Sequence, residues 1–157
     1  TAGDVSERYL AWMNDPEVTR FLEARVEEWT KEKLMGYISA CLVDDRLRFF
    51  AIHYKSVHTG NVKVGPINEH HRFAEVGIVI DKPYWGQGLA TEALLLGSNL
   101  ARDSWHLNKL WAGCYEPNQA AIRAFTKAGF CEEGRFKKQY LLDGQYVDDI
   151  ILGKRLC

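Results

Sequence analysis

The stretch AEVGIVIDKPYWGQGLATE, residues 74–92, decides the fold of this chain. Its first part is an apolar run rich in β-branched residues, which predicts a strand over 74–81. Its last part begins a segment, 88–103, that is predicted to be helical from the spacing of Leu89, Ala93, Leu96 and Leu100. Gly86 and Gly88 lie between the two. The sequence therefore predicts a strand, a tight glycine-containing loop and a helix in direct succession.

Further helices and strands are expected on both sides of this unit. On the N-terminal side these are a helix over 5–14, a short turn opened by Pro16, a helix capped by Thr30, and strands over 47–55 and 61–67 joined by a Thr59-Gly60-Asn61 turn. On the C-terminal side they are a strand over 109–115, a helix over 117–128 ended by Gly129, and strands over 131–142 and 146–153 joined by Asp143-Gly144. This order predicts an α/β (α+β) domain whose mixed sheet is antiparallel in its first half and parallel where strand-helix-strand units occur.

The composition is that of one globular domain over residues 1–157. The 157 residues include 20 Lys and Arg against 21 Asp and Glu, a formal net charge of −1, whereas proteins that neutralise nucleic-acid phosphates carry a basic excess. No apolar run reaches the length of a membrane span, and the first residues do not resemble a secretory signal. We therefore expect a cytoplasmic protein that binds neither nucleic acid nor membranes.

No metal site is expected either. The cysteines form no C-x-x-C pair and no disulfide framework, and are expected to be reduced: Cys41, Cys114, Cys131 and Cys157. His70 and His71 are adjacent, so that on a strand their side chains would point to opposite sides.

The glycine loop is a candidate anion site. A helix N-terminus exposes unpaired backbone N–H groups, and glycines let a ligand approach them closely. The amides concerned belong to Gln87, Gly88, Leu89, Ala90 and Thr91. Three interpretations are open: a dinucleotide loop, which Thr91 fits poorly at the third small position; a tight turn without a ligand; and a loop for the pyrophosphate of coenzyme A.

Two motifs resemble the GNAT family of acyl-CoA N-acyltransferases. The WGQGLA run of 85–90 is similar to the Q/R-x-x-G-x-G/A signature, with Trp85 in the first position as in the RimJ/RimL-like branch. The run EPNQAAIRAFTKAGF of 116–130 resembles the family's N-x-x-A-I-x-x-Y/F-x-K-x-G-F segment, and DGQYVDD of 143–149 resembles the end of that branch. Family members open with a strand before the first helix, and this chain starts at or just beyond that point, so we expect a sheet without that strand.

The resemblance implies acetyl-CoA as co-substrate and no metal. It implies that the strand of the decisive stretch splays from the next parallel strand near 112–115, and that the pantetheine arm lies along Ile78, Val79 and Ile80. The pyrophosphate would bind the loop and helix start, namely Gly86, Gln87, Gly88, Leu89, Ala90 and Thr91. Asn118, Phe125 and Lys127 are further candidate contacts, with Arg123 four residues before Lys127; Asn118 as a helix cap and a solvated helix face are the alternatives.

The implied chemistry is direct attack of an amine on the thioester. A lysine-like amine must lose a proton first, which costs roughly 4–5 kcal/mol at pH 7. Glu75 is the candidate base, and a merely structural Glu75 is the alternative. Family members have a Tyr that protonates the departing thiolate where this chain has Phe125. Tyr115 and Tyr140 are the candidate substitutes, unless the thiolate leaves without an acid.

The acceptor is expected to bind between the first two helices and the final hairpin. Its candidate contacts are Phe21, Glu23, Trp29 and Phe49, with Arg25, Glu27, Glu28 and Tyr140 close by in the same segments. The nearly balanced charges favour an amino sugar or a peptide N-terminus. The runs 14–22, 65–68 and 84–88 resemble members assigned to surface-sugar biosynthesis, which implies an amino sugar linked to a nucleotide as the acceptor. The alternatives are a protein N-terminus, a polyamine or aminoglycoside, and a non-catalytic acyl-CoA-binding module. A homodimer is a further expectation.

Overall fold

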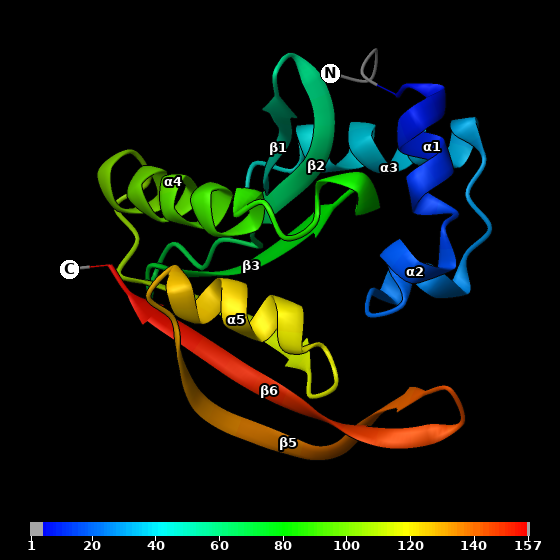
Figure 1. The fold of residues 1–157 in the computed structure, drawn as a ribbon. Coiled ribbons are helices and arrows are strands. Elements are labelled where there is room, and N and C mark those ends of the chain that lie inside the picture. Colours follow the sequence, from blue (N-terminus) through cyan, green and yellow to red (C-terminus); the bar gives the residue numbers. More distant parts are fainter. Residues whose placement is uncertain (1–4, 157) are drawn as a thin grey trace.

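The computed structural model describes residues 5–156. Its elements, labelled in Figure 1, include five helices, α1 (Glu7–Met13), α2 (Pro16–Thr19), α3 (Lys31–Val43), α4 (Leu89–Asp103) and α5 (Gln119–Lys127). Two 3₁₀ turns, η2 (Glu23–Val26) and η3 (Lys82–Tyr84), lie between them. The strands are β1 (Arg48–Tyr54), β2 (Val57–Val64), β3 (Phe73–Ile80), β4 (Lys109–Tyr115), β5 (Cys131–Leu142) and β6 (Gln145–Arg155).

The strands of the described residues form one six-stranded sheet in the order β1-β2-β3-β4-β6-β5. β3 and β4 run parallel, joined by α4, and all other neighbours are antiparallel. The first strand of the sheet begins at Arg48. The predicted α/β domain with a mixed sheet is therefore confirmed.

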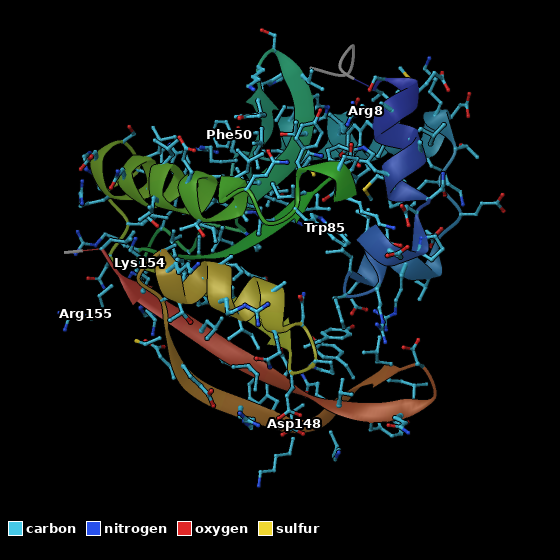
Figure 2. All side chains as sticks on the ribbon, in the orientation of Figure 1. Arg8, Phe50, Trp85, Asp148, Lys154 and Arg155 are labelled. Atoms are coloured by element: carbon cyan, nitrogen blue, oxygen red, sulfur yellow. The ribbon has the colours of Figure 1, made fainter. Side chains whose placement is uncertain are left out.

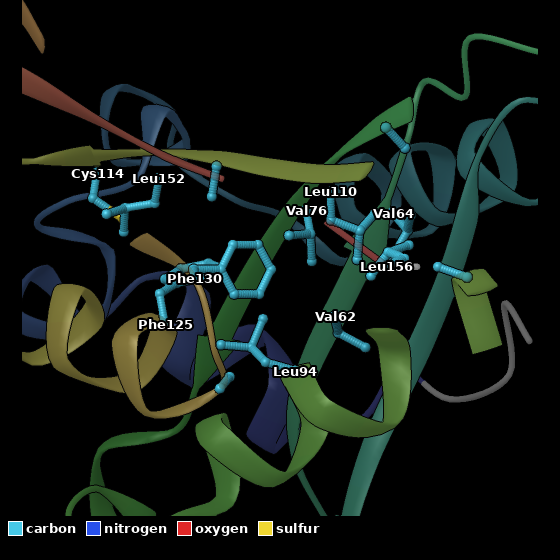
Figure 3. Packing of buried hydrophobic residues seen from close by; sticks show 14 of the residues in the cluster. Val62, Val64, Val76, Leu94, Leu110, Cys114, Phe125, Phe130, Leu152 and Leu156 are labelled. Atoms are coloured by element: carbon cyan, nitrogen blue, oxygen red, sulfur yellow. The ribbon is translucent and has the colours of Figure 1, made fainter. Parts of the chain in front are cut away.

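The helices cover opposite faces of the sheet. On one face, α4 and α5 bury Leu94, Ala101 and Phe125 against strand residues that include Val76, Leu110 and Leu152 (Figure 3). On the other face, α1 and α3 bury an aromatic-rich cluster that contains Tyr9, Trp12, Met13, Leu34 and Ile38. Side chains alternate between these faces along a strand, and Phe49 of β1 and Val79 of β3 pack against the second cluster.

The predicted turn at Thr59-Gly60-Asn61 is wrong. These residues lie inside β2, where the Thr59 hydroxyl donates to the Ile52 carbonyl oxygen at 3.2 Å. The chain reverses at Lys55 and Ser56, whose φ angles are 48° and 65°. Positive φ at both central residues matches the twist of a two-residue hairpin, but neither residue type signals it in a sequence. The second strand accordingly ends at Val64, before the expected 67.

The described helices include none that is long and apolar enough to cross a membrane.

Candidate functional site

β3 and β4 separate part-way along their length. They pair only over Phe73–Glu75 and Lys109–Trp111. Beyond that point β3 stays bonded to β2 as far as Ile80, and β4 stays bonded to β6 as far as Tyr115. The two inner edges thus lack a strand partner from Val76 and from Ala112 onward. Such edges offer amide groups to an extended ligand, and the predicted splay is confirmed.

The glycine loop presents an open helix end beside this splay. Gly86 and Gly88 have φ angles of 73° and 82°, and a Cβ atom on either would meet nothing within 4 Å. Gly88 caps α4 without a side-chain hydrogen bond, so the first amides of the 15-residue helix remain available. Lys82, the cation nearest in sequence, is paired with Glu17. The cradle therefore fits a pyrophosphate held by backbone amides.

Two contacts fix the loop on the domain. Arg8, on α1, donates from Nε and Nη2 to Oδ2 of the buried Asp81 at 2.9 and 2.6 Å. The Trp85 indole N–H donates to the Ile80 carbonyl oxygen at 2.7 Å. Figure 2 labels Arg8 and Trp85 at the two sides of this loop. The Ile80 carbonyl, predicted to face pantetheine, thus already accepts one hydrogen bond.

α5 packs beside α4. Of the residues predicted on it to contact the cofactor, Phe125 is buried, whereas Arg123 and Lys127 are exposed. Asn118 caps the helix, since its Oδ1 accepts from the Ala121 N–H at 3.2 Å. Phe125 is only 3% exposed and meets Phe130 edge to face, so its ring belongs to the core shown in Figure 3. Arg123 and Lys127 are exposed on the helix surface. The expected cap at Asn118 is present, and its amide nitrogen remains free to meet a ligand.

A cavity of about 380 Å³ lies on the α1–α3 face of the sheet, against β3. It brings together three of the four residues predicted for the acceptor, Glu23, Trp29 and Phe49. It is otherwise lined mainly by aromatic and apolar groups: Tyr9, Met13, Leu22, Ala24, Tyr37, Asn61, Lys63, Gly77, Ile78 and Val79. Phe21, the fourth, lies next to it, edge to face with Tyr115 at 6.3 Å.

Two tyrosines stand where the splay opens. Tyr115 and Tyr140 stack with ring centroids 4.6 Å apart. The Tyr115 hydroxyl donates to the Glu23 carboxylate and accepts from Arg25 Nη1. Burial, and then the Glu23 carboxylate, raise the pKa of Tyr115 to about 12, and burial also raises the pKa of Tyr140. Both candidate acids are therefore protonated at neutral pH.

Glu75 is the last β3 residue paired with β4. Its neighbours Ala74 and Val76 point into the α4–α5 core, so its side chain shares the opposite face with Gly77 of the cavity. Loss of hydration raises the pKa of Glu75, and the Lys63 ammonium opposes that shift. A carboxylate with a raised pKa at the mouth of a splay is suited to accept a proton.

Asp149 is a buried acidic residue that the sequence analysis did not single out. It lies on β6 opposite Tyr115, is 4% exposed, and its Oδ1 has no hydrogen-bond partner. The only sequence signal was an acidic residue inside the apolar strand VDDIIL. In an alternating strand this reads as an ordinary solvent-facing residue.

No three described His, Cys, Asp or Glu residues gather closely enough to hold a metal ion.

The family model described as an acetyltransferase (GNAT) domain matches residues 1–131. The chain belongs to the GNAT acetyltransferase family. Spermidine N(1)-acetyltransferase of Escherichia coli K12 is 33% identical over 114 residues, which are 73% of this chain and 59% of that enzyme. The same enzyme of Vibrio cholerae is 28% identical over 89 residues, 57% of this chain and 51% of that enzyme. The chain thus matches less than two thirds of the length of these GNAT relatives.

A solved GNAT structure shares the fold across nearly the whole chain. Spermidine N-acetyltransferase from Vibrio cholerae, solved in complex with CoA and spermine, superposes with a TM-score of 0.84 at 21% identity. The superposition covers 94% of this chain and 88% of that one. The six-stranded mixed sheet and its flanking helices are therefore the GNAT architecture.

Proposed function

We propose that this GNAT domain transfers the acetyl group of acetyl-CoA to a primary amine of a polyamine. The observation that carries the proposal is the set of acidic groups beside the splay, Glu23, Glu75 and Asp149. The stacked rings of Tyr115 and Tyr140 lie among them. Carboxylates and aromatic faces are the groups that attract alkylammonium ions. The likeness to spermidine N(1)-acetyltransferase of Escherichia coli supports the same acceptor class.

This acceptor replaces the amino sugar predicted from the near-zero net charge. A whole-chain charge of −1 says little about the local field, because the field in a cleft is set by the charges that face it. Here Arg25 is engaged by the Tyr115 hydroxyl and Glu23, so the local charge beside the splay is set by the carboxylates of Glu75 and Asp149, with Lys63 opposing at Glu75. The RimJ/RimL-like branch and the homodimer stay predictions.

The chain's own residues supply orientation and proton transfer. Acetyl-CoA, when bound, supplies an activated acetyl thioester. The first amides of α4, with Gly86 and Gly88, would hold its pyrophosphate, and the free β3 edge from Val76 would hold its pantetheine. Glu75 would accept a proton from the acceptor ammonium, whose deprotonation costs about 4–5 kcal/mol at pH 7. Tyr115 and Tyr140 are the protonated groups nearest the opening.

An acceptor panel tests the proposal. Thiol release from acetyl-CoA is measured with spermidine, with glucosamine and with a peptide bearing a free N-terminus. We expect spermidine to give the highest kcat/KM. A higher kcat/KM with glucosamine or the peptide overturns the polyamine assignment. If no amine causes thiol release but calorimetry shows tight binding of CoA, the domain is a non-catalytic acyl-CoA-binding module instead.

The pyrophosphate cradle is tested by Gly88→Trp. A tryptophan at this left-handed position strains the backbone and fills the open helix end. We expect CoA affinity to fall at least about tenfold, corresponding to about 1.4 kcal/mol. Gly144→Trp is the matched control, because Gly144 has a φ of 79°, an equally open Cβ position and a place in the β5–β6 turn. Unchanged CoA affinity in Gly88→Trp, or an equal loss in the control, contradicts the assignment.

A further inference from the structure

Asp149 lies directly at the splay rather than in the apolar core. Its β6 neighbours Ile150 and Leu152 are buried in the α4–α5 core, so Asp149 points to the opposite face, the face of Glu75. It reaches diagonally across β4 to Gly113, where a Cβ atom would lie 3.0 Å from both carboxylate oxygens. The missing side chain at Gly113 thus leaves the room that the carboxylate occupies.

The carboxylate is buried without a compensating cation. Burial raises the pKa of Asp149, the Glu75 carboxylate raises it further, and the Cys114 backbone N–H opposes both. The other titratable groups that interact with it electrostatically are the Tyr140 hydroxyl on β5 and, from the other face of the sheet, the Cys114 thiol on β4. Neither carries a positive charge. A buried carboxylate with an unpartnered oxygen costs stability, and such a cost is characteristic of a site that awaits a ligand.

We propose that Asp149 is a second catalytic carboxylate: Glu75 and Asp149 together bind the acceptor's ammonium group, and Asp149 rather than Glu75 alone accepts its proton. The inference rests on the proposed function, because it requires an amine acceptor. An ammonium between the two carboxylates supplies a positive charge to Asp149, adds to that of Lys63 at Glu75, and donates to the unpartnered Oδ1. Glu75 enters from β3 and Asp149 from β6, so the two approach the amine from opposite sides of the splay.

The proton balance of the step is as follows. The acceptor R–NH₃⁺ loses one N–H bond as an O–H bond forms on Asp149 Oδ1, which leaves R–NH₂ and a neutral carboxylic acid. The amine lone pair then forms the C–N bond with the thioester carbonyl carbon, and the C–S bond breaks. The second proton leaving nitrogen goes to the departing thiolate, and Asp149 returns its proton to water.

Asp149→Asn tests the role through a pH profile. The variant keeps the shape of the side chain but cannot accept the proton, so we expect kcat/KM for spermidine to fall about 10²-fold near pH 7. The deficit should shrink about tenfold per pH unit toward pH 10, because free amine in solution then no longer needs a base. A parent-to-variant ratio that stays constant with pH, or an unchanged kcat/KM, overturns the proposal. A constant ratio is what a structural defect produces.

Asp148→Asn is the matched control on the same strand. The Asp148 carboxylate accepts from the Lys138 N–H at 2.9 Å and lies 3.5 Å from Arg135 Nη1, on the hairpin labelled in Figure 2. We expect its kcat/KM to stay within about twofold of the parent, because its carboxylate is engaged by Lys138 and Arg135. A pH-dependent deficit equal to that of Asp149→Asn would overturn the specific role of Asp149.

A binding measurement separates the two proposals. Spermidine is titrated by calorimetry into the parent and the Asp149→Asn variant, each loaded with CoA. We expect at least a tenfold weaker Kd in the variant, because the ammonium loses a charged partner. Equal affinities overturn the role of Asp149 even if the parent acetylates no amine, whereas a parent without acetylation on any amine overturns only the proposed function.

Discussion

The two faces of the sheet differ in how completely their polar groups are satisfied. On the α4–α5 face the core is aliphatic and aromatic, and its buried Ser98 hydroxyl donates to the Leu94 carbonyl oxygen at 2.7 Å. On the α1–α3 side lie all the buried, unpartnered side-chain atoms of the described residues: Trp12 Nε1, His58 Nδ1, Asn61 Nδ2 and Asp149 Oδ1. The cavity lies there too. The α4–α5 face therefore stabilises the domain, whereas unpartnered polar atoms and a cavity on the α1–α3 face lower its stability and leave room for a ligand.

The largest expected effect is a loss of folding stability, which should differ between alanine substitutions of two buried leucines, one on each face. Leu94 on α4 is 1% exposed and Leu34 on α3 is fully buried. Leu94→Ala should lower the free energy of unfolding by about 2–5 kcal/mol, because the packed core cannot collapse onto the void. Leu34→Ala should cost less, because its cluster borders the cavity and its neighbours have room to move. Urea denaturation of both variants measures the difference, and an equal or larger loss in Leu34→Ala contradicts it.

Two glycines on neighbouring strands, Gly60 and Gly77, differ in the space around them, and their alanine variants should change stability by a smaller amount. On Gly60, a Cβ would lie 2.5 Å from the Val79 carbonyl oxygen and 2.7 Å from Ile80 Cδ1, whereas on Gly77 it would meet nothing within 4 Å. Gly60→Ala should therefore destabilise the domain by about 1–3 kcal/mol. Gly77→Ala should stabilise it by about 0.4–1 kcal/mol and raise the KM for the acceptor, because the new methyl group enters the cavity.

Thermal unfolding and acceptor kinetics check the glycine pair together. A destabilised Gly77→Ala would contradict the open space around its Cβ position. An acceptor KM that changes equally in both variants would show that Gly77 does not border the acceptor space.

The sequence predicted the elements whose signals are local. Apolar spacing predicted α4 and β3, and Asp143-Gly144 predicted the β5–β6 turn. The β1–β2 turn was mispredicted, because Lys55 and Ser56 adopt positive φ without glycine or asparagine to announce it. Local sequence patterns predict whether a segment is a helix or a strand. A turn without glycine, asparagine or proline depends on the strands around it and has no such pattern.

The candidate site was predictable only where a motif defines it. The cradle at Gly86 and Gly88 follows from a short run of sequence. Asp149 depends on the register that sets it opposite Tyr115 and on the bare backbone of Gly113, 36 positions earlier. Pairings between distant strands leave no local signature, so the meeting of Glu75 and Asp149 became visible only in the fold.

The last expected effect, similar in size to that of Gly60→Ala but opposite in sign, is a gain in stability from Asp149→Asn. A carboxyl pKa that burial raises means that the folded state holds its proton more tightly than the unfolded state does. Unfolding then becomes easier as pH rises from the ordinary value of 3.8 through the folded value, the reverse of a salt-bridged carboxylate.

Asparagine removes this penalty, so the variant should be more stable than the parent by about 1–3 kcal/mol near pH 7. The gain should vanish below about pH 3, where the parent carboxyl is protonated in both states. Chemical denaturation at the two pH values measures it, with Asp148→Asn as the reference whose loss of contacts to Arg135 and Lys138 predicts the opposite sign. If Asp149→Asn instead lowers stability at neutral pH, the carboxylate has a structural partner, and the contrast between the two faces of the sheet does not extend to the splay.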